Sequence, residues 1–261
     1  MTSTNGAALP VAFIGHGNPN NVFGGNRYTD AWAAFGATLR PRAILMVSAH
    51  WYVGATRVTA SAHPRTVHDF ASYRPRLFAF HYPAPGDPVL AQRVRDLLAP
   101  LPVELDERWG YDHGAWAVLA NAYPAADVPV VQLSIDRTQP PQWHYEMAQR
   151  LSPLRDEGVL IVASGNVIHN IEIMRNDWPN APEGWERRFA ADLDRRLASG
   201  DHAALIAYDK LGRDAQLAIP TPDHYLPLLY VIATRQQGEN ITFPVEGVDG
   251  GSISMLSVSV G

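Results

Sequence analysis

Short apolar runs alternate with amphipathic segments along this 261-residue chain, and that alternation limits the fold more than any other feature. Four runs rich in β-branched residues and bounded by Gly, Pro or Ser are typical of buried strands; they span residues 11–14, 43–47, 128–133 and 159–163. Amphipathic periodicity predicts helices over residues 28–39, 87–99, 114–123, 141–157, 183–199 and 223–236. The order of these segments predicts one α/β domain whose central, largely parallel or mixed sheet is flanked by helices on both faces.

The remaining segments predict a tail, one more strand and two loops. Residues 1–8 are expected to form a flexible N-terminal tail, which leaves residues 9–261 as the folded domain. Residues 252–260 alternate with a period of two, which predicts a half-exposed strand at an edge of the sheet. Segments 61–86 and 174–186 are rich in Pro and aromatic residues and are expected to be long surface loops, which usually carry function.

Composition excludes several classes of protein. The chain has no cysteine, so disulfide scaffolds, thiolate metal sites and thiol nucleophiles are ruled out, and any metal must bind to His, Asp or Glu. A net charge of −5 without a dense basic run argues against nucleic acid as a partner. We find neither an apolar stretch long enough to span a bilayer nor a basic region before the first apolar run, so we expect a cytoplasmic protein with no membrane partner. The chain shows no heptad seam, which favours a monomer.

Common nucleotide-binding and catalytic motifs receive little support. Residues 15–20 follow a predicted strand as a dinucleotide-binding loop would, but Asn20 replaces the third glycine and Pro19 lies inside the loop. The chain contains no P-loop, no H-E-x-x-H and no G-x-S-x-G motif. The chemistry must therefore be sought among the ten histidines.

Histidines at the ends of predicted strands give the strongest functional signal. His16, His50 and His169 each follow a different strand, and ligands of open α/β sheets bind where the carboxyl ends of the strands converge. Imidazole is the commonest metal ligand, so the three together favour a catalytic metal site, although each alone also fits a hydrogen-bonded residue at a sheet edge. His224 lies at a predicted helix start behind Asp223, a candidate N-cap. It is either a ligand, a neighbour of the ligands or a donor to a backbone carbonyl.

A residue that moves protons is also expected. His113 precedes a predicted helix, and the neutral-range pKa of a histidine suits general acid–base catalysis. Asp112, directly before it, either orients His113 or caps the helix. With Asp112, three more residues are candidates for substrate contact: His68 beside a long loop, and Trp51 and Tyr225 beside the histidine motifs. Core packing is the ordinary alternative for the two aromatic residues.

Seven ordered blocks contain these residues, with the exception of His68: GHGNP at 15–19, VSAHW at 47–51, HYPAPG at 81–86, DHG at 112–114, VQLSID at 131–136, ASGNVIHN at 163–170 and TPDHYLPLL at 221–229. Together they closely resemble the class III extradiol ring-cleavage dioxygenases, in the branch of the 4,5-DOPA extradiol dioxygenases. The resemblance runs along essentially the whole chain, and it implies that residues 9–261 form an extradiol dioxygenase catalytic domain.

The resemblance implies a metal held by His16, His50 and His169, with His224 as an additional ligand or close neighbour, and His113 as the catalytic acid–base. It implies that Fe(II) supports activity, that Zn(II) can occupy the same site, and that a small catechol and O2 are the substrates. For L-DOPA, the ring-opened semialdehyde is a seco-DOPA, which cyclises to betalamic acid or muscaflavin according to the bond that is cut. The wider class III group commonly uses two His and one carboxylate, whereas the matching third position here is His169.

Two other functions are compatible with the same histidines. A zinc-dependent hydrolase would use them to activate water, with His113 protonating the leaving group. A noncatalytic metal- or catechol-binding protein would bind its ligand without turnover. Oxygen consumption separates the dioxygenase from both alternatives.

Overall fold

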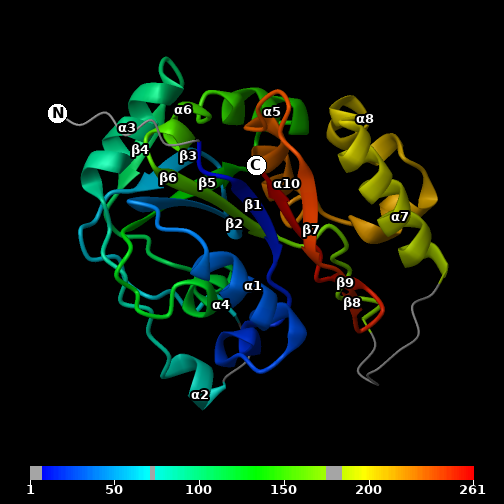
Figure 1. Cartoon of the computed structure of the whole chain (residues 1–261), viewed down its shortest axis with the longest axis horizontal. Helices are drawn as coiled ribbons and strands as arrows, with labels where there is room; N and C mark the ends of the chain where they lie inside the picture. The colour runs from blue at the N-terminus through cyan, green and yellow to red at the C-terminus, as the bar shows by residue number, and fades with distance from the viewer. Residues whose placement is uncertain (1–7, 71–73, 175–183) are drawn as a thin grey trace.

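An eight-stranded mixed sheet crosses the centre of the molecule, with helices on both of its faces (Figure 1). The computed structural model describes residues 8–70, 74–174 and 184–261. The strand order is β4-β3-β5-β2-β6-β1-β10-β7, and β8 and β9 form a separate two-stranded sheet. The strands are β1 Val11–Gly15, β2 Ala43–Val53, β3 Thr56–Thr59, β4 Val103–Asp106, β5 Val130–Asp136, β6 Val159–Gly165, β7 Ile241–Val245, β8 Val248–Asp249, β9 Ile253–Ser254 and β10 Ser257–Val260.

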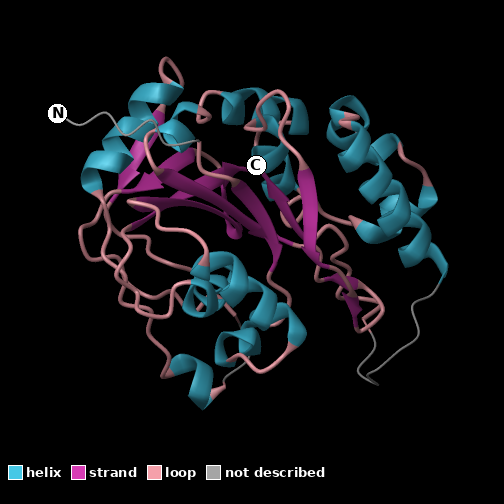
Figure 2. Ribbon diagram, in the orientation of Figure 1, coloured by secondary structure: helices cyan, strands magenta, loops and turns pink. Residues whose placement is uncertain are grey.

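Helices of very different lengths connect these strands (Figure 2). The α-helices are α1 Arg27–Ala37, α2 Pro75–Phe78, α3 Pro88–Leu98, α4 His113–Ala122, α5 Pro141–Gln149, α6 Pro153–Asp156, α7 Gly184–Ser199, α8 His202–Ile206, α9 Arg213–Ala218 and α10 Leu226–Ala233. Two 3-10 helices, η1 Pro19–Phe23 and η2 Tyr208–Lys210, complete the described elements.

The middle of the sheet is parallel. Strand β2 pairs in parallel with β5 and β6, and β6 pairs in parallel with β1. Strand β10 runs antiparallel to β1, and β7 runs antiparallel to β10. Because β1 and β6 are buried along their whole length, their sequences are nearly continuous apolar runs. The predicted α/β fold with a mixed sheet is confirmed, and the carboxyl ends of β2, β6 and β1 lie side by side.

Two hydrophobic cores, one on each face of the sheet, hold the layers together. Side chains that alternate along β1 divide between them, since successive residues of a strand point to opposite faces. Val11 and Phe13 belong to the core that includes residues of α3, α5 and α10, whereas Ala12 and Ile14 belong to the core built with α1 and α4. Figure 1 shows α1 and α4 on one side of the sheet and α3, α5 and α6 on the other.

Local signals explain where the helices begin. The Asp87 side chain caps α3, and Asn26 caps α1 within a capping box. The predicted helix at 141–157 divides into α5 and α6 because Pro153 has no backbone N–H to continue the first of them. The other predicted helices agree with the structure to within a few residues at their ends.

The C-terminal strand lies inside the sheet, and the prediction of a half-exposed edge strand was wrong. Strand β10 is paired on both sides, and the edge is β7. A period-two pattern indicates two different faces, but it cannot reveal that a further strand pairs with the outer side. Strands β3, β4 and β7 were missed because none of them is a long apolar run.

The two predicted loops differ in how much of them the structure describes. The described parts of segment 61–86, residues 61–70 and 74–86, are largely irregular and include the four-residue helix α2. Most of the predicted loop at 174–186 and residues 1–7 of the predicted tail lie outside the described residues. Within the described residues, no helix combines the length and the apolar character that crossing a membrane requires.

Candidate metal centre

Three histidines meet at the carboxyl ends of the neighbouring strands β1, β2 and β6. His16 directly follows β1, and His50 lies in β2 just past the part that pairs with β6. His224 lies in the turn that leads into α10, and its carbonyl accepts the N–H of Asn166, the residue after β6. The last residue of β6 is Gly165, where a Cβ would collide with that carbonyl, so glycine allows the close approach.

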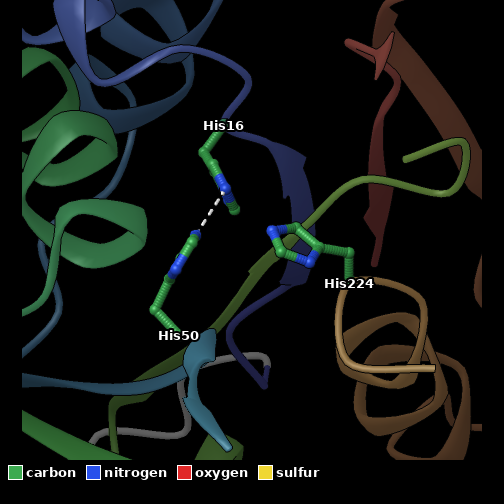
Figure 3. A group of neighbouring side chains, drawn as sticks. All are labelled: His16, His50 and His224. Carbon is green, nitrogen blue, oxygen red and sulfur yellow. Dashed lines mark hydrogen bonds between the residues drawn. The ribbon is translucent and has the colours of Figure 1, made fainter. Parts of the chain in front are cut away.

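The separation of the ring nitrogens fits a single metal ion. His16 Nε2 and His50 Nε2 are 3.1 Å apart, and each of the three histidines offers a nitrogen within 4.8 Å of the others. Figure 3 shows the His224 ring turned toward His16 and His50. Two nitrogens that each lie about 2.0–2.1 Å from one ion are separated by roughly 3 Å.

The other nitrogen of each ring has a partner that fixes the tautomer. Ser164 Oγ donates to a backbone carbonyl, so it must accept the Nδ1–H of His16, at 2.8 Å. His50 Nδ1 lies 3.0 Å from the Asp69 carboxylate, and His224 Nδ1 bonds to the Asp223 carboxylate. Carboxylates only accept, so every Nδ1 carries a hydrogen, and the Nε2 of each ring offers its lone pair to a metal once the ring is neutral.

Burial keeps two of these imidazoles neutral. It lowers the pKa of His16 well below its ordinary value, and the nearby histidines lower it further. Burial also lowers the pKa of His224 to about 4, although Asp223 opposes this. Burial lowers the pKa of His50 too, but the hydrogen bond and charge of Asp69, together with the charges of Asp112 and Asp223, outweigh it and the net shift is upward. Because a metal ligand must be neutral, His50 is the member that has to release a proton when a metal binds.

Asp223 does not cap α10 as expected. Its carboxylate bonds to His224 Nδ1, and the N-cap position of α10 is Tyr225, which makes no capping bond with its side chain. The sequence pattern was compatible with both roles, since an Asp before a helix and an Asp beside a histidine look alike.

His169 lies beside the group formed by His16, His50 and His224. Its ring stacks on His224, with centroids 3.5 Å apart and planes 4° apart, and it shares a second potential metal-binding group with Asp223 and His224. Burial and the charge of His224 lower the pKa of His169 to about 3. His16, His50 and His224 thus form one compact group of imidazoles, and His169 lies directly beside it. Three residues, 166–168, separate the end of β6 from His169.

Asp69, which sequence reasoning missed, links His113 to His50. Its Oδ2 atom lies 2.9 Å from His113 Nδ1 and 3.0 Å from His50 Nδ1, and its Oδ1 accepts the His113 backbone N–H at 2.8 Å. The hydrogen bonds from both imidazoles hold the pKa of Asp69 far below its usual range, against the effect of burial. The only signal in the sequence was that Asp69 lies within a long loop, 61–86, of the kind that carries function.

His113 is the first residue of α4 and lies against His50, with ring centroids 3.7 Å apart. Since Asp69 accepts its Nδ1–H, its Nε2 carries a lone pair. Burial lowers the pKa of His113, and the charge of His50 lowers it further, while Asp69 acts in the opposite direction. A neutral imidazole with a fixed tautomer is suited to accept a proton.

Asp112 has the capping role that the sequence allowed. It accepts the N–H of Ala115 at 3.1 Å at the start of α4, and its carboxylate also bonds to Ser48 and Gln132. The side chain is fully buried. Asp112 therefore stabilises the start of the helix that carries His113, and Asp69 provides the orientation of the imidazole.

A pocket of about 630 Å³ opens over these histidines. Its described lining residues are His16, Gly17, Asn18, Pro19, His50, Asp69, Phe70, His113, His169, Ile171, Met174, His224, Asp249, Gly250 and Ile253. Apolar side chains and a group of imidazoles share one space, which suits an aromatic molecule that binds a metal through polar atoms.

Three other expected substrate contacts lie outside the described lining of this pocket. Trp51 is buried and stacks on Trp109, with centroids 5.4 Å apart. The Tyr225 hydroxyl donates to a backbone carbonyl at 2.8 Å. His68 lies 3.1 Å from the Phe80 carbonyl and stacks on Phe78. These contacts are those of packing residues around the site.

Comparisons with known proteins show the family to which the chain belongs. The family described as the catalytic LigB subunit of aromatic ring-opening dioxygenase matches residues 15–244. A protein of Escherichia coli K12 called 4,5-DOPA dioxygenase extradiol is 49% identical over 267 residues, with 100% of this chain and 97% of that protein covered. A Beta vulgaris protein of the same name is 34% identical, with 93% of this chain and 92% of the relative covered.

A solved structure supports the fold as well. The crystal structure of an uncharacterized protein from Escherichia coli K12 has a TM-score of 0.86 and 46% sequence identity, and it covers 97% of this chain and 100% of the other. The resemblance in the sequence blocks is confirmed, and the family decides between ring cleavage and the two alternatives drawn from the histidines. The chain belongs to the family of the catalytic LigB subunit of aromatic ring-opening dioxygenases and is an extradiol ring-cleavage dioxygenase.

Proposed function

We propose that this enzyme opens the ring of a catechol such as L-DOPA with O2, using Fe(II) bound by His16, His50 and His224. The observation that carries the proposal is the presence, in one pocket, of a three-imidazole group and a separate neutral base, His113. The relatives called 4,5-DOPA dioxygenase extradiol support L-DOPA as the first substrate to test.

The donor set suits a divalent metal of this kind. Imidazole nitrogens bind both iron and zinc, and three of them leave coordination positions open. Fe(II), when bound, supplies a Lewis acid for the catechol oxygens and a path for electrons from the ring to O2. Zn(II) fits the same nitrogens without that redox step, so we expect Fe(II) to be the active metal. His169 borders the ligands in this proposal and is a neighbour of the metal site.

His113 moves the proton. Its Nε2 takes a proton from a catechol hydroxyl as the substrate binds, and Asp69 stabilises the imidazolium that results. His113 later returns this proton to an oxygen atom of the substrate as the ring opens. Because burial lowers the pKa of His113, the imidazole is ready as a base at neutral pH.

The pocket walls offer apolar contacts to the ring. Phe70, Ile171, Met174 and Ile253 contribute apolar surface around the imidazoles. For L-DOPA, the ring-opened semialdehyde is a seco-DOPA, which cyclises to betalamic acid or muscaflavin according to the bond cut.

Metal replacement tests this function. The protein is stripped of metal, restored anaerobically with Fe(II) or Zn(II), and mixed with L-DOPA or other catechols while O2 and the visible spectrum are followed. We expect O2 uptake and a yellow ring-opened product with Fe(II), and neither with Zn(II). Full Fe(II) occupancy without O2 uptake on any catechol would contradict the proposal.

A further inference from the structure

Asp249 is a carboxylate in the pocket, and the metal site does not use it. The described lining of the pocket contains two carboxylates, Asp69 and Asp249. Asp69 is engaged by His50 and His113. Asp249 lies on β8, which is not among the elements that carry the histidine group.

Strand pairing places Asp249 at a defined separation from the histidines. His169 forms an antiparallel bridge with Ile253, and Ile253 is paired with Asp249 in the β8–β9 sheet. Two such steps of about 4.5–5.5 Å put the Asp249 backbone roughly 10 Å from that of His169. A catechol whose oxygens face the histidines can therefore extend a short side chain toward Asp249.

The Asp249 carboxylate is fixed in place and keeps one oxygen open. Oδ1 accepts the Tyr28 hydroxyl at 2.9 Å, and Arg27 donates to the same hydroxyl at 3.2 Å. Among the described residues, no hydrogen bond reaches Oδ2. Burial raises the pKa of Asp249, while the Tyr28 bond and the Arg27 charge act in the opposite direction.

Charge around the pocket favours a cationic group at this position. The described lining residues include neither Lys nor Arg, so none of them offers a permanent positive charge to a substrate carboxylate. Arg27 faces the Tyr28 hydroxyl and lies over the Tyr28 ring, 4.6 Å from its centroid. A half-buried carboxylate with a free oxygen forms a strong, charge-assisted bond with an ammonium group.

We propose that Asp249 determines specificity by binding the ammonium group of an amino-bearing catechol, so that the enzyme selects catechols with a positively charged arm over neutral and anionic ones. The proposal rests on the proposed function, because the ring end of the substrate must face the histidine group. Asp249 does not touch the reacting atoms, so its substitution changes substrate preference while the ring chemistry persists.

Binding to the Zn(II)-loaded protein tests this without turnover. Calorimetry compares dopamine, 4-ethylcatechol and 3-(3,4-dihydroxyphenyl)propionate, which share the ring and differ in the charge of the arm. We expect the wild type to bind dopamine about tenfold more tightly than 4-ethylcatechol, a difference of about 1.4 kcal/mol. Asp249→Asn, which keeps an acceptor for Tyr28, should remove that preference. Asp249→Lys should shift it toward the propionate.

Control variants and outcomes keep the two proposals separate. Asp30→Asn removes the same charge from an exposed site on α1 and should leave all three affinities unchanged. Equal wild-type affinity for dopamine and 4-ethylcatechol would overturn the role of Asp249, as would a preference that survives in folded Asp249→Asn. O2 uptake by the Fe(II)-loaded protein is measured in parallel. If neither L-DOPA nor any of the three catechols is consumed while the binding preference holds, the proposed function fails and the selective binding by Asp249 stands.

Discussion

Replacing Asp69 by Asn changes which nitrogen of two imidazoles carries the hydrogen. The Oδ1 atom of Asp69 accepts the His113 backbone N–H at 2.8 Å, and an amide oxygen can keep that bond. The amide nitrogen then takes the place of Oδ2, which lies 2.9 Å from His113 Nδ1 and 3.0 Å from His50 Nδ1. An NH2 group donates, so both rings must move their hydrogen to Nε2. His50 then has no lone pair for a metal, and His113 has none for a proton.

Two losses follow from Asp69→Asn, and their sizes differ. Removing a general base costs about 10²–10⁴-fold in rate, and changing the partner of a metal-bound imidazole costs about 10–100-fold in metal affinity. We therefore expect kcat to fall by about 10²–10⁴-fold even at saturating Fe(II). The assay is O2 uptake with L-DOPA over a range of Fe(II) concentrations, with Zn(II) affinity measured against a competing chelator.

A matched control separates this effect from general damage. Asp30→Asn makes the same chemical change at an exposed position and should keep both kcat and metal affinity. If Asp69→Asn is folded and retains kcat within about threefold of wild type at saturating Fe(II), the tautomer argument is refuted.

Three further results are expected. His113→Gln should retain the metal but lose about 10²–10⁴-fold in kcat, measured by O2 uptake alongside metal analysis; unchanged turnover would remove His113 from the mechanism. In the metal-free protein, burial lowers the pKa of His50, but Asp69, Asp112 and Asp223 together raise it above its ordinary value, so Zn(II) affinity should fall about tenfold per pH unit as pH drops below the raised pKa. A chelator titration that gives equal affinities at pH 6 and pH 8 would contradict this. Burial and the charge of Glu246 raise the pKa of Asp194 to about 6. The folded protein therefore pays a free-energy cost for the charged form of Asp194, which is absent at low pH and complete above the raised pKa. Asp194→Asn removes this cost and should stabilise the protein by about 1–2 kcal/mol at pH 7.5, after allowance for solvent screening, and by little at pH 4. Urea unfolding of both proteins at the two pH values checks the difference, and an equal gain at both would exclude this cause.

The sheet and part of the site were predictable because they depend on local patterns. Apolar runs that end in histidine motifs indicate parallel strands, and the carboxyl ends of such strands meet at one edge. That reasoning brought His16 and His50 together, as the structure does. It left open whether His224 is a ligand or a neighbour of the ligands, because the approach of α10 to the end of β6 depends on a contact between segments distant in the sequence.

Asp69 was beyond the reach of the sequence for the same reason. It lies in an irregular segment, and its role comes from two histidines, one 19 residues earlier and one 44 residues later in the chain. For residues 257–260 the local pattern correctly predicted a strand, but the predicted position at the edge of the sheet was wrong. Their partner β7 has no strong apolar run to reveal it.

The stoichiometry of O2 consumption distinguishes ring cleavage from other oxidations of a catechol. Fe(II)-loaded protein is mixed with a measured amount of L-DOPA, and O2 consumed, hydrogen peroxide formed and the mass of the product are determined together. We predict one O2 consumed per catechol, no hydrogen peroxide and a ring-opened product, with no uptake by the metal-free protein. A product that keeps the aromatic ring or is an intact quinone, or peroxide formed in step with O2 uptake, would contradict ring cleavage at this site.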